Sequence, residues 1–127
     1  MRSFLFVPGD STRKFESAKK TAADALILDL EDSIAPDQKV VARGITREML
    51  DARNPEQKLY IRVNALDTDL TLGDLAAVMP GKPDGIVLPK CAGAADVNKL
   101  ALYLDAFEAA SGIAQGTTRI ITVATET

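Results

Sequence analysis

Five short apolar runs alternate with four amphipathic stretches along the chain, and this alternation limits the possible fold more than any other feature. The apolar runs are dominated by Val, Ile, Leu and Phe, which is typical of buried strands, while the stretches between them show helical spacing. Pro and Gly stand where these elements are expected to end. Strands are predicted over residues 3–7, 25–30, 58–64, 84–89 and 119–124, and helices over 11–21, 37–52, 70–79 and 94–110.

The order of these elements predicts an α/β protein with a parallel sheet. A strand followed by a helix occurs four times before the fifth strand, and nearly continuous apolar runs suit strands that are covered on both faces. Two architectures satisfy this pattern. One is a small doubly wound domain, and the other is the first half of an eight-stranded (β/α)8 barrel. Periodicity alone does not separate them.

Composition excludes several classes of chemistry and partner. The sequence contains no histidine, which excludes Ser-His-Asp triads, Cys-His dyads and His-ligated zinc within this chain, so that any metal must be held by oxygen. The single cysteine, Cys91, has no partner for an internal disulfide, and a net charge of -3 argues against nucleic acid. No run approaches the roughly 18 apolar residues of a membrane span, and the N-terminal run meets Pro and Gly too early for a signal peptide. We expect a cytoplasmic protein with no membrane partner.

Charged and polar residues gather where the predicted strands end, which is the edge where parallel α/β folds bind ligands. Side chains alternate along a strand, so Asp29 and Glu31 share one side, as do Arg62 and Asn64. If these sides face inward, two carboxylates and a guanidinium meet in one cleft.

A structural explanation competes with a ligand site. Buried charges need partners, so Glu31 and Asp32 are also expected to form a supporting network with Arg62 or Lys90. Lys90 ends the fourth predicted strand, where a Schiff-base lysine would sit in a barrel aldolase, but neutralising the nearby carboxylates is the favoured role. Cys91 has no histidine to activate its thiol and is expected to be a small, partly buried residue.

The segments SFLFVPGDSTRKF, ADALILDLEDSIAPDQKVVAR, LYIRVN, GIVLPK and TET follow one another in an order that resembles the citrate lyase beta-subunit-like family, which belongs with the HpcH/HpaI aldolases. The resemblance spans essentially the whole chain. It implies a (β/α)8 barrel that forms trimers or hexamers and binds Mg²⁺. It also implies an acyl-CoA lyase, which cleaves or forms a carbon–carbon bond between an acyl-CoA and a 2-oxo acid.

The resemblance also implies roles for particular residues. Glu126 matches a magnesium-ligating glutamate, and the second ligand is expected beyond Thr127. Arg62 matches the arginine that holds the oxo acid, and Glu31 matches an acidic residue in the same pocket. Three further positions match the loop and helix that contact CoA: Pro8, Gly9 and Lys14.

A complete barrel takes about 250 residues. Residues 1–127 are therefore expected to be a truncated piece of a longer protein and to form the N-terminal half of its barrel. The intact protein is expected to be a magnesium-dependent lyase that cleaves a citryl-, malyl- or citramalyl-CoA type of substrate, and the 127-residue piece alone is expected to be inactive. Two alternatives stay open. One is an acyl-CoA thioesterase of the same family, and the other is a non-catalytic half-barrel that serves as an assembly partner.

Overall fold

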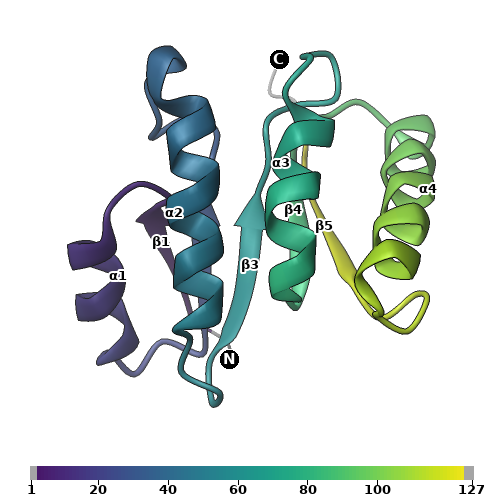
Figure 1. The fold of residues 1–127 in the computed structure, drawn as a ribbon. Helices are drawn as coiled ribbons and strands as arrows, with labels where there is room; N and C mark the ends of the chain where they lie inside the picture. The colour runs from purple at the N-terminus through teal and green to yellow at the C-terminus, as the bar shows by residue number, and fades with distance from the viewer. Residues whose placement is uncertain (1–2, 125–127) are drawn as a thin grey trace.

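The computed structural model describes residues 3–124 as an α/β unit in which strands and helices alternate along the chain (Figure 1). The elements lie close to their predicted positions, because the apolar periodicity that marks them reflects burial. The strands are β1 (Phe4–Pro8), β2 (Ala25–Asp29), β3 (Lys58–Arg62), β4 (Gly85–Cys91) and β5 (Arg119–Ala124). The helices are α1 (Thr12–Lys19), α2 (Lys39–Asp51), α3 (Thr71–Val78) and α4 (Ala94–Ser111), with 3-10 turns η1 (Pro36–Gln38) and η2 (Met79–Gly81).

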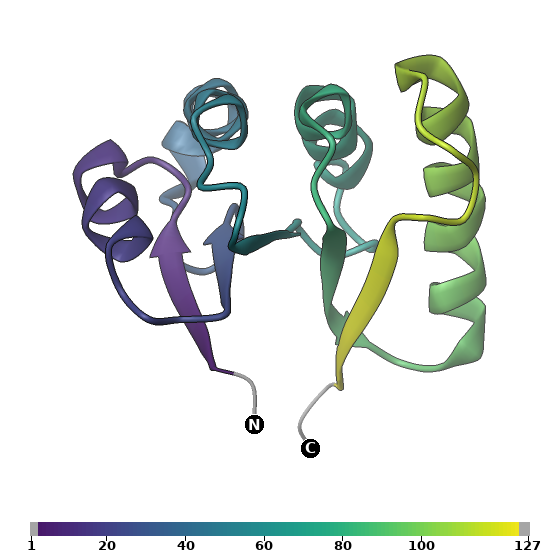
Figure 2. The same ribbon diagram turned by 90° about the horizontal axis from the view of Figure 1, so that it is seen from below.

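The five strands form one parallel sheet in the order β1-β2-β3-β4-β5. Figure 2 shows the sheet curving, with all four α-helices on one of its faces. A doubly wound domain would reverse its strand order and carry helices on both faces. Sequential order with helices on one side is instead the arrangement of a (β/α)8 barrel, of which this chain supplies four βα units and a fifth strand.

The two faces of the sheet carry different side chains. On the helical face, Leu26, Leu28 and Ile61 are fully buried and belong to the main hydrophobic core with residues from the helices. On the opposite face, a smaller cluster combines Ala25, Ile27, Tyr60 and Val87. This second face corresponds to the interior of the barrel. Because side chains alternate along a strand, every second residue of each strand points to this face.

The barrel-facing side of β1 is open. Phe4 and Phe6 are 49% and 52% exposed, although both are large aromatic residues on a strand. Phe4 contacts Tyr60 of β3 through tilted rings whose centroids are 6.2 Å apart. An exposed apolar surface of this kind is typical of a site where other protein structure packs.

Helix boundaries follow from local chemistry. Ser11 caps α1, because its side-chain oxygen accepts a hydrogen bond from the Lys14 amide at 3.3 Å. Helix α4 ends at Ser111 and is capped by Gly112, whose φ of 70° is the left-handed conformation that glycine adopts without a Cβ clash. Within residues 3–124, no helix is long and apolar enough to cross a membrane.

Candidate active site

The centre of the candidate site is an ion pair between Arg62, the last residue of β3, and Asp29, the last residue of β2. These residues are direct partners in the parallel register, and both side chains point to the barrel side of the sheet. Arg62 Nε lies 2.9 Å from Asp29 Oδ1, and Arg62 Nη2 lies 2.9 Å from Asp29 Oδ2. This is a two-bond, fork-like pairing, which is among the strongest geometries for a guanidinium and a carboxylate.

Asp29 is almost fully buried, at 2% exposure. Burial raises the pKa of Asp29, but hydrogen bonds from Arg62 and from the backbone amides of Glu31 and Ser33 outweigh burial and lower the pKa to about 2. The same pair raises the pKa of Arg62. Both groups are therefore charged throughout the physiological pH range.

Glu31 extends this cluster and links it to β4. Its Oε1 lies 3.7 Å from Arg62 Nε, and its Oε2 accepts a 2.7 Å hydrogen bond from Lys90 Nζ. Hydrogen bonding and charge attraction from Glu31 raise the pKa of Lys90, so the ammonium form is favoured. The structure thus joins Arg62 and Lys90 through Glu31, as the supporting network predicted, whereas Asp32 is exposed and forms no ion pair within residues 3–124.

Lys39 of α2 holds the segment that follows β2. Its ammonium group donates to the carbonyl oxygens of Leu30, at 3.1 Å, and Glu31, at 2.5 Å. A cleft of about 550 Å³ adjoins this turn, and Glu31, Lys39 and Lys90 are among the residues that line it. The cleft therefore lies beside the charged cluster, at the carboxyl ends of the strands.

The prediction for Asn64 was wrong. Asn64 was expected to share the side of Arg62, but it lies two residues beyond the end of β3 and its side chain turns toward α3 instead. Asn64 is instead buried, and its side-chain amide donates to Leu30 O at 3.0 Å and to Asp74 Oδ2 at 2.8 Å. Asp74, which the sequence analysis missed, also pairs with Arg43 Nε at 2.9 Å. The available signal was a lone acidic residue in the otherwise uncharged α3.

The three residues predicted to contact CoA lie at the end of β1, in the turn that follows it and on α1. Gly9 is buried, and its amide donates to Asp29 O at 2.8 Å while its carbonyl accepts from Thr46 Oγ1 at 2.8 Å. A Cβ on Gly9 would lie only 2.5 Å from Thr46 Oγ1, so no larger residue fits there without a shift. Pro8 precedes it at the end of β1, and Lys14 is exposed on α1. Contact of these residues with a ligand stays a prediction.

The predicted metal ligand Glu126 lies outside the described residues. Among residues 3–124, no group of three or more Cys, Asp or Glu side chains could hold a metal ion. Asp29 is committed to Arg62 and to two backbone amides, and Glu31 to Lys90. Both carboxylates of the charged cluster are therefore already paired with donors of the protein.

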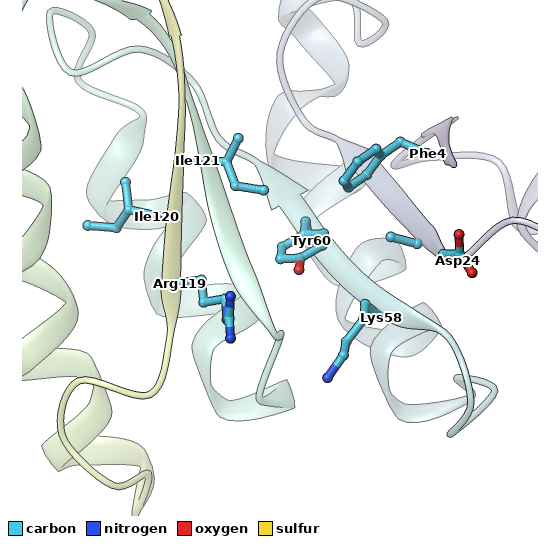
Figure 3. A pocket seen from close by; sticks show the side chains of 8 residues that line it. Phe4, Asp24, Lys58, Tyr60, Arg119, Ile120 and Ile121 are labelled. Atoms are coloured by element: carbon cyan, nitrogen blue, oxygen red, sulfur yellow. The ribbon is translucent and has the colours of Figure 1, made fainter. Parts of the chain in front are cut away.

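A second hollow, of about 480 Å³, lies near the amino ends of the strands on the barrel-facing side (Figure 3). Figure 3 shows Tyr60 at its centre, with Phe4 on one side and Arg119 on the other. Arg119 begins β5, whereas Arg62 ends β3, so this hollow is at the opposite end of the sheet from the charged cluster. In (β/α)8 barrels the catalytic end is the carboxyl end, so the cluster around Arg62 is the candidate active site.

Sequential parallel strands, helices on one face and a charged cluster at the strand ends define this chain as part of a (β/α)8-barrel protein. Over residues 2–127 the sequence matches the family described as HpcH/HpaI aldolase/citrate lyase. The chain belongs to this family.

Curated relatives carry two kinds of activity. A (3S)-malyl-CoA thioesterase from Cereibacter sphaeroides is 42% identical over 101 residues, which cover 79% of this chain and 35% of the thioesterase. An L-malyl-CoA/beta-methylmalyl-CoA lyase from the same species is 37% identical over 115 residues, which cover 87% of this chain and 36% of the lyase. The chain thus spans about a third of the length of these relatives.

Solved structures agree with the fold. The citrate lyase beta subunit from Mycobacterium tuberculosis, complexed with oxaloacetate and magnesium, is 32% identical with a TM-score of 0.72 over 95% of this chain and 46% of that one. The protein CitE from the same organism, in complex with magnesium, acetoacetate and coenzyme A, is also 32% identical, with a TM-score of 0.72, over 95% of this chain and 38% of that one.

Proposed function

We propose that the intact protein is a magnesium-dependent carbon–carbon lyase that cleaves a 3-hydroxyacyl-CoA to an acyl-CoA and a 2-oxo acid. The observation that carries this proposal is the position of Arg62, which is held at the catalytic end of a family barrel between Asp29 and Glu31. A malyl-CoA lyase among the relatives, and a neighbour complexed with oxaloacetate, support an acidic substrate of this class.

Cleavage requires the 3-hydroxyl group to lose its proton while the adjacent carbon–carbon bond breaks. The electron pair of that bond moves onto the thioester as an enolate, and the hydroxyl carbon becomes the keto carbon of the oxo acid. The enolate then takes up one proton to give the acyl-CoA, which balances the proton that the hydroxyl group loses to a base. In this scheme Arg62 binds the carboxylate of the oxo-acid half and stabilises negative charge there. Glu31 lies in the same pocket, where its charge and its bond to Lys90 fix the polar surface that the substrate meets.

Magnesium, when bound, would polarise the oxygens of the oxo acid. We assign one ligand to Glu126 and a second to a residue beyond Thr127, as the family resemblance implies. A magnesium ion at this site is supported by the neighbours that are complexed with magnesium.

A thioesterase is the second candidate, because the (3S)-malyl-CoA thioesterase is 42% identical to this chain. Thioesterase and lyase act on the same thioester but break different bonds. Hydrolysis releases free CoA thiol and the hydroxy acid, whereas lyase cleavage keeps the thioester and releases a 2-oxo acid. Incubating the full-length protein with (3S)-malyl-CoA, and measuring free thiol and glyoxylate in parallel, assigns one reaction or the other.

The binding role of Arg62 is tested by calorimetric titration of the full-length protein with oxaloacetate, pyruvate or glyoxylate in the presence of magnesium. Arg62→Ala is expected to weaken binding by about 100-fold, because it removes a charged, fork-shaped donor from a carboxylate. The Lys58→Ala variant serves as a control, since Lys58 is exposed at the amino end of β3, at the opposite end of that strand from Arg62. Metal-independent binding that Arg62→Ala leaves unchanged would contradict the proposal.

A further inference from the structure

The geometry points to Asp29 and Phe6 as positioning residues, which hold the Arg62 guanidinium so that one edge of it remains open to a ligand carboxylate. This inference rests on the proposed function, in which Arg62 binds the oxo acid. It adds a role for two residues to which neither the sequence pattern nor the comparisons assign one.

The edge of Arg62 that remains open follows from the atoms that Asp29 occupies. A guanidinium carries five N–H groups in one plane. Asp29 takes the Nε–H and one Nη2–H, both at 2.9 Å. Among residues 3–124 no hydrogen bond uses Nη1 of Arg62, so the Nη1–Nη2 edge keeps a second fork that matches a carboxylate in two-bond geometry.

Phe6 fixes the plane of the same group. The Arg62 Cζ atom lies over the Phe6 ring, 4.8 Å from its centroid, in a cation–π contact. Phe6 belongs to β1, so the guanidinium is held along one edge by β2 and on one face by β1. A ligand carboxylate is therefore directed to the remaining edge, in the guanidinium plane.

Asp29 is itself rigidly held, as a positioning residue must be. The Glu31 amide donates to its Oδ1 at 2.8 Å, and the Ser33 amide donates to its Oδ2 at 3.0 Å. The backbone carbonyl of Asp29 accepts from the Gly9 amide at 2.8 Å. Because these donors are backbone groups, the path of the backbone fixes the position of the Asp29 carboxylate. That carboxylate in turn fixes the position of the Arg62 guanidinium.

The test compares oxaloacetate dissociation constants, measured by calorimetry with magnesium present, for the full-length protein and its variants. Asp29→Asn keeps the shape of the side chain but replaces one acceptor with a donor, which breaks the fork. We expect binding to weaken by about 10- to 100-fold. Phe6→Leu removes the aromatic face and is expected to weaken binding by about two- to fivefold.

Asp84→Asn is the matched control, because Asp84 forms another partly buried pair with an arginine, Arg53, at the amino-terminal side of β4. This variant is expected to bind oxaloacetate within twofold of the wild type. A loss of binding of the same size in Asp84→Asn and Asp29→Asn would overturn the inference, because general destabilisation would then explain both.

Chemical rescue separates positioning from mere support of the fold. In Arg62→Ala, added guanidinium ion is expected to occupy the vacated place against Asp29 and to restore oxaloacetate binding. In the double variant Arg62→Ala with Asp29→Asn, the two-oxygen carboxylate that would bind the same ion is gone, and guanidinium is expected not to restore oxaloacetate binding. An equal response of the two proteins to guanidinium would overturn the inference.

The crystal structure of the Asp29→Asn protein provides a readout that needs no ligand. The inference predicts that Arg62 leaves its place over Phe6 in that variant. If the wild type binds no 2-oxo acid, the proposed function fails, whereas a displaced Arg62 still supports the positioning role. An Arg62 that stays in place, with oxaloacetate affinity within twofold of the wild type, would overturn the positioning role alone.

Discussion

At the scale of single residues, the site is a chain of alternating charges. Asp29, Arg62, Glu31 and Lys90 follow one another with contacts of 2.9, 3.7 and 2.7 Å, so each charge has an opposite neighbour. Buried or partly buried charges are tolerated only when they are paired in this way. The cluster therefore presents fixed dipoles and hydrogen-bond donors to a ligand without a large net charge of its own.

Lys90 tests whether this pairing permits Schiff-base chemistry. Nucleophilic attack needs a neutral amine, but Glu31 raises the pKa of Lys90 and keeps it protonated. We therefore expect no covalent adduct on Lys90 when the full-length protein is treated with pyruvate and borohydride at neutral pH and analysed by mass spectrometry. Lys90→Met provides the blank. An adduct on Lys90 that forms equally well in the presence of a chelator would favour a Schiff-base aldolase instead.

At the scale of elements, a buried network joins the helical layer to the strand ends. Asp74 of α3 is fully buried and accepts hydrogen bonds from Arg43 of α2 and from both the backbone and the side chain of Asn64. Arg43 also donates to Leu70 O at 2.9 Å. Asn64 follows β3 two residues after Arg62, so this network fixes the backbone that carries the candidate active-site arginine.

Asp74→Asn is expected to lower the free energy of unfolding by about 2–4 kcal/mol, because it leaves Arg43 partly buried without its counter-charge. Asp51→Asn is the matched control. Its pair with Arg47 is exposed, with 59% of the Asp51 side chain accessible, and is expected to contribute less than about 1 kcal/mol. Urea unfolding of both full-length variants measures the difference. Equal midpoints for the two variants would contradict a stabilising role for the buried network.

Elements with a strong period could be predicted from the sequence, and contacts between distant elements could not. Apolar alternation along β2 and β3 correctly placed Asp29, Glu31 and Arg62 together, because parallel strands bring their carboxyl ends to one edge. The same rule failed for Asn64, whose side chain hydrogen-bonds to Asp74 of α3, whereas Glu31, which also lies two residues past its strand, stays beside Arg62. The contact of Asp74 with Asn64 depends on how α3 packs, which no local pattern encodes.

At the scale of the whole molecule, the sheet has one covered face and one open face. Periodicity could not choose between a doubly wound domain and a barrel, because both bury their strands. The strand order and the single helical layer settle this choice (Figure 2). The chain covers 46% of the citrate lyase beta subunit structure, so the barrel-facing residues Phe4 and Phe6 are expected to be buried in the intact protein.

Phe4→Lys tests whether the rest of a barrel covers this open face. In the isolated 127-residue chain, where Phe4 is 49% exposed, a lysine should reduce self-association, because it places a charge on an apolar surface. In the full-length protein the same lysine would be buried, and we expect the free energy of unfolding to fall by about 3 kcal/mol or more. Size-exclusion chromatography of the isolated chain and urea unfolding of the full-length protein measure these opposite effects.

Val40→Lys is the matched substitution, because Val40 lies on α2 and is 69% exposed, so its effect on unfolding should stay within about 0.5 kcal/mol. An unchanged stability of full-length Phe4→Lys would mean that the open face is not closed by the rest of the same chain. If the isolated chain were also a discrete homodimer that Phe4→Lys dissociates, a second copy would be the cover. The half-barrel would then act as an assembly partner, and the lyase proposal would lose its structural basis.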